Sequence, residues 1–332
     1  MCSSDLHGSR GGFRAADKAD EVDEALWQGT FVVPKAGTKA YGVTWATKKA
    51  DANGSFALGG NYTMLAYAAT TVTVPQDIGV SIRADRAWDV YVNGRRQPGD
   101  VYGSGALRVP ARLRAGGNAI VLRARAGQSL SAGFQTSTHE ALFNPNDLTR
   151  PDFRVGDATE RWLGVPVLVF GGPAHQVTAR VMGNAGFAAT ETAFPSLAGG
   201  AVTQVPFLLR PKQAALAKDE KWTAELQVDS PDWAHAYAFT VEFMTVAPDA
   251  NFRQTFRSPD DGSVQVYGVR PPLNYDESKS YGLVLSLHGA GVDPMGQVGA
   301  YSSRDWTWII AATNRRPFGF DWEEWGRINA IA

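Results

Sequence analysis

Short runs of alternating hydrophobic and polar positions, separated by Gly, Asn and Pro, fill the chain from about residue 25 to residue 245. Such runs are typical of β-strands with one buried face. The clearest is residues 87–92, which ends at Asn93-Gly94, a dipeptide that suits the positive φ angles of a tight hairpin turn. Another turn, at Gly116-Gly117-Asn118, leads into a strand over residues 119–125. Residues 21–145 are therefore predicted to form an all-β sandwich, and helical periods are scarce there.

Residues 146–250 continue this pattern, with Pro and Gly between the runs. Five strands are expected here, over residues 164–170, 177–182, 202–209, 222–228 and 237–243. About seven short strands in ~100 residues favour an immunoglobulin-like sandwich, although the Cys-Trp-Cys core pattern is missing. Residues 246–250 are interpreted as a short linker.

The pattern changes at residue 251. Strands are expected over residues 252–256 and 263–269, around a turn at 259–262. Residues 281–287 are nearly all apolar, which is typical of a strand buried on both faces of a parallel sheet. A second apolar run covers residues 308–312, and residues 295–305 between the two are long enough for a crossover helix. This order predicts an α/β domain over residues 251–332.

Both ends of the chain look cut. Residues 1–20 show no hydrophobic period and are expected to form a disordered tail. Near the other end, Asp321 and Glu324 fit a capping box, and the apolar face of the helix that follows still continues at the last residue. We therefore expect a truncated domain that leaves the apolar strand at 281–287 partly exposed.

Composition narrows the function classes. The 332 residues are enough for two or three domains. A composition of 44% hydrophobic and 20% charged residues excludes a disordered chain. A net charge of −1 gives no reason to expect a nucleic-acid partner, and no apolar run is long enough for a membrane helix. The single cysteine excludes an internal disulfide and a zinc site built on several thiolates. No metal or organic cofactor is expected.

The main candidate for chemistry is the loop His288-Gly289-Ala290-Gly291, directly after the apolar strand. Glycines allow backbone N–H groups to approach a negatively charged oxygen closely, as acyl transfer requires. The same four residues could also form an ordinary tight turn between a strand and a helix. No serine in the chain lies in a G-x-S-x-G pattern, so the sequence offers no nucleophile for this loop.

On these motifs, residues 252–332 resemble the N-terminal part of α/β-hydrolases of the prolyl-oligopeptidase and polyhydroxybutyrate-depolymerase-like esterase group. The resemblance implies that residues 288–291 are an oxyanion loop, with donors near Gly289 and Ala290, and that His288 orients the loop. It also implies a serine peptidase or esterase acting on an ester or peptide substrate. Because nucleophile, acid and base are all missing, this chain alone is expected to be inactive.

Residues 21–145 resemble the galactose-binding-like jelly rolls attached to many glycosidases. This resemblance implies either a carbohydrate ligand or a spacer role, and with the other β-module it implies an extracellular or periplasmic location, although no signal peptide is present. The competing interpretation is a non-enzymatic carbohydrate-binding or adhesion protein made of two β-sandwiches.

Overall fold

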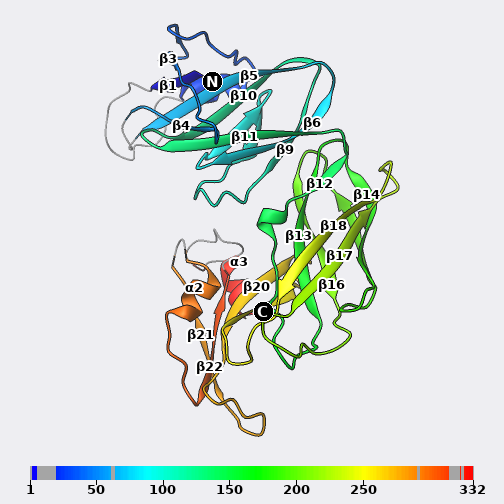
Figure 1. The fold of residues 1–332 in the computed structure, drawn as a ribbon. Helices are drawn as coiled ribbons and strands as arrows, with labels where there is room; N and C mark the ends of the chain where they lie inside the picture. Colours follow the sequence, from blue (N-terminus) through cyan, green and yellow to red (C-terminus); the bar gives the residue numbers. More distant parts are fainter. Residues whose placement is uncertain are drawn as a thin grey trace. The chain divides into compact units, whose positions relative to one another are not determined.

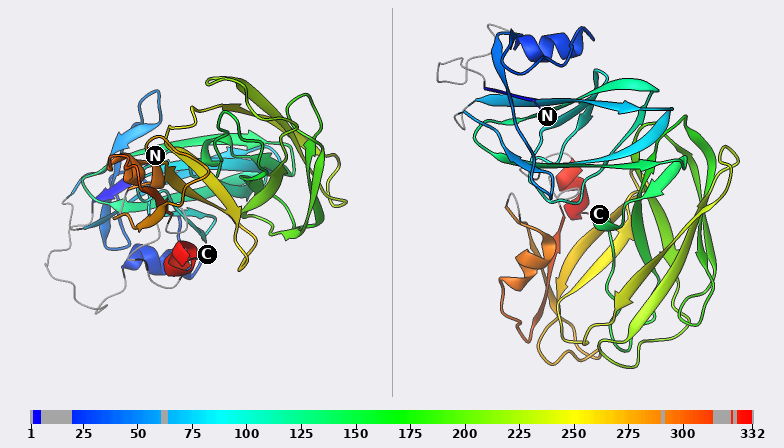
Figure 2. Two further views of the ribbon diagram at one scale, coloured as in Figure 1. Left: turned by 90° about the horizontal axis from the view of Figure 1, so that it is seen from below. Right: turned by 45° about the horizontal axis from the view of Figure 1, so that its top comes forward.

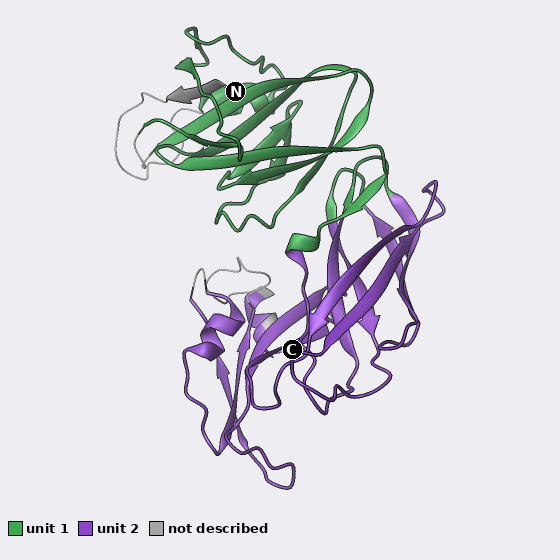
Figure 3. Cartoon of the chain, in the orientation of Figure 1, with its two compact units in different colours: residues 1–146, 168–173, 198–202 green, residues 147–167, 174–197, 203–332 purple. Residues whose placement is uncertain are grey.

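The chain is almost entirely β in the computed structural model, which describes residues 2–5, 20–60, 64–289, 292–313, 322 and 325–331 (Figure 1). It divides into two compact units (Figure 3). Unit 1 contains residues 1–146, 168–173 and 198–202, and unit 2 contains residues 147–167, 174–197 and 203–332. Within the described ranges, no helix is long and apolar enough to cross a membrane.

Unit 1 is built from two antiparallel sheets. The first has seven strands in the order β2-β3-β1-β5-β10-β7-β8 and the second has four in the order β4-β11-β6-β9. The predicted turn at Asn93-Gly94 is confirmed, since both residues have positive φ, 50° and 82°, between β7 and β8. The bounds are β1 (Cys2–Asp5), β2 (Lys39–Ala40), β3 (Val43–Thr47), β4 (Ser55–Ala57), β5 (Leu65–Val74), β6 (Ile78–Asp85), β7 (Asp89–Val92), β8 (Arg95–Pro98), β9 (Val109–Leu113), β10 (Gly116–Arg125) and β11 (Ser129–Ser137); β12 (Ala141–Phe143) and a 3-10 turn (Pro145–Asp147) follow.

Residues of both sheets share one buried core, so the expected β-sandwich is confirmed. Ala66 and Ala68 of β5 face this core together with Ile82 of β6 and Leu130 of β11. The alternate β5 positions, Tyr67 among them, are buried in a second apolar cluster on the other face of the seven-stranded sheet. Because β5 is covered on both faces, its sequence shows little polar alternation.

The second cluster is closed by α1 (Glu21–Trp27), a helix that the sequence pattern did not predict (Figure 2). Its seven residues contribute Val22 and Leu26 to the cluster, one i, i+4 pair, which is too short a signal to recognise as a helical period. Its N-cap, Asp20, accepts hydrogen bonds from the Val22 backbone N–H and from the Tyr67 hydroxyl.

The expectation of a disordered tail is wrong for residues 2–5. They form β1, which pairs antiparallel with both β3 and β5. Pairing of this kind is made by backbone groups and does not need an alternating apolar pattern, so the hydrophobic pattern of residues 2–5 does not predict it. The rest of the predicted tail, residues 6–19, lies outside the described residues.

Unit 2 contains the predicted strands of residues 146–250. One sheet has the order β15-β14-β17-β18, and β13 pairs with β16 in another. The sequence pattern did not predict β15. Its polar, Pro-containing sequence is tolerated because it is an edge strand. The core of this part of unit 2 holds a cluster of aromatic rings, Phe153, Phe187, Trp222 and Phe243. The bounds are β13 (Arg161–Val169), β14 (Ala174–Met182), β15 (Thr190–Leu197), β16 (Val202–Leu209), β17 (Lys221–Asp229) and β18 (Tyr237–Met244).

The last sheet of unit 2 is mixed and has the order β19-β20-β22-β21. Its strands are β19 (Phe252–Arg257), β20 (Val264–Arg270), β21 (Gly282–Ser286) and β22 (Thr307–Ala312). β21 and β22 are parallel, and the connection between them carries α2 (Pro294–Gly299). The predicted crossover is therefore confirmed, although its helix is shorter than the expected range of 295–305.

An α/β-hydrolase domain is not evident in the described part of residues 251–332, so this part of the predicted fold class stays a prediction. The residues predicted as a short linker, 246–250, lie between β18 and β19, and the Val246 backbone N–H donates to the Phe153 carbonyl. The Thr255 hydroxyl likewise donates to the Trp162 carbonyl, at 2.6 Å.

The last helix is α3 (Trp325–Ile331), and its predicted capping residues, Asp321 and Glu324, lie outside the described residues.

β21 lies at the edge of its sheet, and its apolar side chains are exposed. Leu283, Val284 and Leu285 expose 66%, 38% and 41% of their surface. Burial on both faces is thus wrong for this strand, because consecutive side chains point to opposite faces of the sheet and all three are exposed. The partial exposure predicted for the apolar side chains of this strand is confirmed.

Candidate functional site: the loop after strand β21

The candidate loop begins at the carboxyl end of the parallel pair β21 and β22. Because the strands run in the same direction, His288 beyond β21 and Thr313 beyond β22 lie at the same edge of the sheet. Open α/β sheets bind ligands at this edge, outside the carboxyl ends of their parallel strands. Of the four predicted loop residues, His288 and Gly289 are described; Ala290 and Gly291 lie outside the described residues.

The His288 side chain is tied to its own loop. It is 6% exposed, and its Nδ1 lies 2.9 Å from the carbonyl oxygen of Gly289. A carbonyl oxygen only accepts hydrogen bonds, so Nδ1 carries the proton in this contact. The Trp322 indole packs edge-on against the imidazole, with ring centroids 5.0 Å apart, and its N–H donates to the His288 carbonyl at 2.8 Å. These contacts fix both the ring and the backbone at the start of the loop.

Gly289 leaves open space beside the backbone. A Cβ built on this residue would meet no atom of another described residue within 4 Å, its immediate chain neighbours aside, and the residue does not have a positive φ. Neither steric crowding nor an unusual backbone conformation therefore requires glycine here. The Gly289 carbonyl also accepts from the Val292 backbone N–H, at 3.3 Å, which closes the loop as a turn.

Hydrogen bonds hold α2 against the strand that precedes the loop. The Gln297 side-chain amide donates to the Ser286 hydroxyl at 2.7 Å, and that hydroxyl lies 2.8 Å from the Tyr301 hydroxyl. Asp293 caps the helix by accepting from the Gly296 N–H at 2.7 Å. Both ends of the loop are therefore anchored, the first at β21 and the second at α2.

The close approach of α2 to the sheet depends on Gly268 of β20. A Cβ at this position would lie 2.4 Å from the Pro294 carbonyl oxygen. Such a distance is shorter than any van der Waals contact, so only glycine permits this packing without a shift of the helix.

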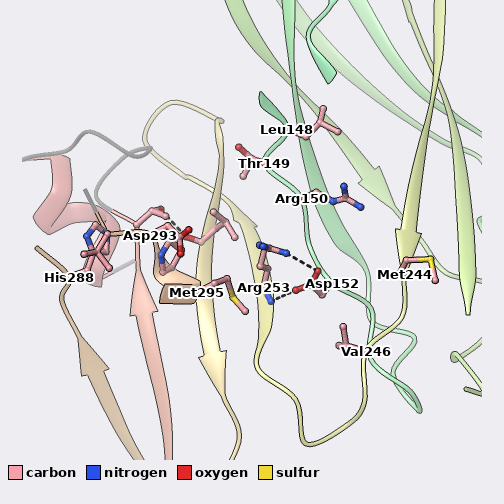
Figure 4. Close-up of a pocket in the computed structure, with 14 residues that line it drawn as sticks. Leu148, Thr149, Arg150, Asp152, Met244, Val246, Arg253, His288, Asp293 and Met295 are labelled. Atoms are coloured by element: carbon pink, nitrogen blue, oxygen red, sulfur yellow. Dashed lines mark hydrogen bonds and ion pairs between the residues drawn. The ribbon is translucent and has the colours of Figure 1, made fainter. Parts of the chain in front are cut away.

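A cavity of about 570 Å³ opens beside the loop (Figure 4). Its floor carries the Arg253–Asp152 pair, in which the Arg253 backbone N–H donates to Asp152 at 2.7 Å and Nη1 lies 3.3 Å from the other carboxylate oxygen. The loop side is formed by His288, Val292, Asp293, Pro294, Met295 and Thr313, and the opposite side by Leu148, Thr149, Arg150, Met244 and Val246.

Arg150 is the other guanidinium that lines this cavity. Its Nη2 donates to the Glu242 carbonyl at 2.5 Å, and its guanidinium lies over the Phe243 ring, 5.3 Å from the centroid. Burial lowers the pKa of Arg150, the Asp152 carboxylate opposes this, and the charge of Arg253 adds to it. The cavity thus combines apolar walls with guanidinium and carboxylate groups.

The described part of this site lacks a serine or cysteine nucleophile, although Thr149 and Thr313 are among its lining residues. No serine or cysteine lines the cavity, and the described residues contain no group of His, Cys, Asp and Glu arranged to hold a metal ion. What the site offers is a glycine-containing loop at the carboxyl end of a parallel strand, beside a cavity of ligand size. The far wall of the cavity comes from residues about 140 and 45 positions earlier in the chain, so no sequence pattern near the loop could have identified it.

Comparisons with known proteins give weak similarities only. No family model and no curated protein matches the chain. Among solved structures, a GH2 beta-galacturonidase from Eisenbergiella tayi matches with 11% identity and a TM-score of 0.35, over 80% of this chain and 46% of that one. A Parabacteroides merdae beta-glucuronidase matches with 14% identity and a TM-score of 0.32, over 89% and 40%.

A thermostable esterase matches with 16% identity and a TM-score of 0.17, over 45% of this chain and 52% of the esterase. All three are hydrolases, and this chain spans less than two thirds of each of them. All three TM-scores are below 0.5, and we base no conclusion about this chain on these similarities.

Proposed function

We propose that this chain is the N-terminal part of a serine hydrolase, a carboxylesterase or a peptidase, and that residues 288–291 form its oxyanion loop. The observation that carries the proposal is the position of the loop. β21 is the third strand of its sheet in chain order, and the loop joins it to the helix α2. In α/β-hydrolases the loop between the third strand and the first helix supplies one of the oxyanion N–H groups.

The contacts of the loop suit this role. An oxyanion donor works best when it is held in place before the reaction, so that no reorganisation is needed as charge develops. His288 and Trp322 fix the start of the loop, and Asp293 fixes its end. Open space at Gly289 leaves room for the reacting carbonyl. His288 acts as a positioning residue, since its Nδ1 proton is already committed to the loop.

The nucleophile, its base and the acid that orients the base would come from the complete protein. Serine would attack the carbonyl carbon of the ester or peptide substrate, histidine would accept the serine proton, and the loop N–H groups would stabilise the resulting oxyanion. No metal or organic cofactor takes part. The jelly-roll-like and immunoglobulin-like modules would act as spacers or binding modules outside the cytoplasm.

The test is a substitution that removes one loop N–H in the complete protein. Gly289→Pro deletes this donor, and we expect kcat for a p-nitrophenyl ester to fall by about 100-fold or more, as for other oxyanion donors. Gly289→Ala keeps the N–H and is the matched control, and we expect it to retain activity within about tenfold because the added methyl meets no described residue within 4 Å, its immediate chain neighbours aside.

Labelling with a fluorophosphonate tests whether the complete protein has a reactive serine. The complete protein should be labelled at one serine, whereas the 332-residue chain should not be labelled. Equal activity of the Pro and Ala variants, with folding intact by circular dichroism, would mean that the Gly289 N–H is not an oxyanion donor.

A further inference from the structure

A second cavity, of about 370 Å³, lies in unit 2 and shares no residue with the cavity beside His288. It lies against the strands β19, β20, β21 and β22 and the segment that leads into β13. Its polar wall is formed by Arg154, Asp157 and Arg161, and its apolar wall includes Phe252, Tyr267 and Trp308. Neither the sequence motifs nor the proposed catalytic role uses these residues.

The charges at this cavity are not balanced. Arg161 Nη2 lies 2.6 Å from Asp157 Oδ2, and Arg154 Nη2 lies 3.9 Å from the same oxygen. The other carboxylate oxygen of Asp157 accepts from the backbone N–H and the hydroxyl of Thr159. The two guanidinium groups thus share one carboxylate, which leaves the three charged groups with one net positive charge.

Both guanidinium groups also have an unused donor. Among the described residues, no hydrogen-bond partner exists for Nε of Arg154 or for Nε of Arg161, although both atoms are buried. The Arg161 side chain is only 5% exposed. Burial lowers the pKa of Arg161, the Asp157 carboxylate opposes this, and the nearby charge of Arg154 adds to it. A buried guanidinium whose charge is only partly compensated is costly, and the negative charge of an anion in the cavity would recover part of that cost.

The surroundings of the charges are aromatic. The Arg154 guanidinium stacks on Phe252, 4.3 Å from the ring centroid. Tyr267, whose pKa is raised by burial, and Trp308 line the same cavity together with the exposed side chain of Leu283. A ligand that fits both walls needs one negative group and an apolar body next to it.

We propose that this cavity is a binding site for a carboxylate attached to an apolar or aromatic group, held by Arg154 and Arg161. Guanidinium groups bind carboxylates through paired N–H donors, and a single carboxylate charge matches the single net positive charge of the site. The cavity volume is suitable for a small aromatic acid. The same chemistry is offered by an Asp or Glu side chain next to an apolar residue in a polypeptide.

The test uses the 332-residue chain and isothermal titration calorimetry. The probes are 3-phenylpropanoate, the neutral 3-phenylpropanamide of the same shape, and the capped dipeptide acetyl-Phe-Glu-amide. We expect binding of a carboxylate probe to be at least about tenfold tighter than that of the amide, since a charge-assisted contact is lost in the amide. This comparison needs no variant and so does not depend on the folding of one.

A pair of variants locates the site. Arg154→Gln should weaken carboxylate binding by about tenfold. Arg257→Gln is the control, because Arg257 also lies over an aromatic ring, that of Trp162, but does not line the cavity; it should leave the Kd unchanged.

The probes distinguish the source of the ligand. Tighter binding of 3-phenylpropanoate than of the dipeptide supports a free aromatic acid, and the reverse order supports an acidic polypeptide segment. The proposal is overturned if neither carboxylate binds, if the amide binds as tightly as the acid, or if Arg154→Gln and Arg257→Gln behave alike.

Discussion

At the scale of single residues, Asp89 holds together the buried charges of unit 1. Its side chain is 6% exposed and lies 2.7 Å from Arg96 and 2.6 Å from Arg123. Arg123 also reaches Asp23 of α1, so this network joins the helix to the sheet. Asp89→Asn would leave the buried guanidinium of Arg123 with Asp23 as its remaining carboxylate partner, and we expect a loss of about 3 kcal/mol in the free energy of unfolding. Urea denaturation followed by circular dichroism measures it.

Arg112→Gln is the control substitution for Asp89→Asn. Arg112 and its partner Asp77 are both more than half exposed and are 3.7 Å apart. Exposed pairs of this kind contribute little, so the change should stay within about 0.5 kcal/mol. Equal effects of the two substitutions would show that burial of the Asp89 network does not matter for stability.

The Asp157 carboxyl should make the stability of the folded protein depend on pH. Burial alone would raise the pKa of this carboxyl, but hydrogen bonds from Thr159 and the charges of Arg161 and Arg154 outweigh it and lower the pKa. Because the folded pKa lies below the unfolded value of about 4, the stabilisation is complete above pH ~4 and is lost as the pH falls through the folded pKa. Wild type should therefore exceed Asp157→Asn in stability at pH 6, and the difference should shrink toward pH 2. A difference that grows on acidification would contradict this assignment.

At the scale of elements, the position of α2 depends on Gly268. Gly268→Ala would push a methyl group against the Pro294 carbonyl, and we expect a destabilisation of about 1–3 kcal/mol, as for other overpacked sites. Gly299→Ala, at the last residue of the same helix, meets no atom within 4 Å and should be neutral or stabilising by up to about 1 kcal/mol. Urea midpoints of both variants test the contact, and a neutral Gly268→Ala would show that α2 packs elsewhere.

Elements with a strong local pattern were predictable, and elements made by long-range contacts were not. The β7–β8 hairpin follows from Asn93-Gly94, and the parallel β21–β22 pair follows from two apolar runs with room for a helix between them. Helix α1 is stabilised by the sheet face that it covers, and β15 is an edge strand in which only Thr192 and Leu197 are buried. The same distinction applies to the site: His288 and Gly289 carry a local motif, whereas Arg253 and Asp152 reach the cavity through tertiary packing.

At the scale of the whole molecule, the apolar edge strand β21 should make residues 251–332 the first target of proteolysis. Leu283, Val284, Leu285 and Leu287 are all exposed there, and exposed apolar segments at a sheet edge open easily. Limited digestion with chymotrypsin, followed by mass spectrometry, should therefore yield an early fragment that keeps the β-sandwich of unit 1. Simultaneous cleavage throughout the chain would contradict this order.

The most direct test of the proposed hydrolase is the reading frame of the source gene beyond the codon for Ala332. We predict that the frame continues into a G-x-S-x-G pattern, followed in order by an Asp or Glu and a His, which would place a nucleophile beside residues 288–291. A stop codon directly after Ala332 would contradict the hydrolase. Carbohydrate binding by residues 21–250, measured on a glycan array, would then become the leading hypothesis.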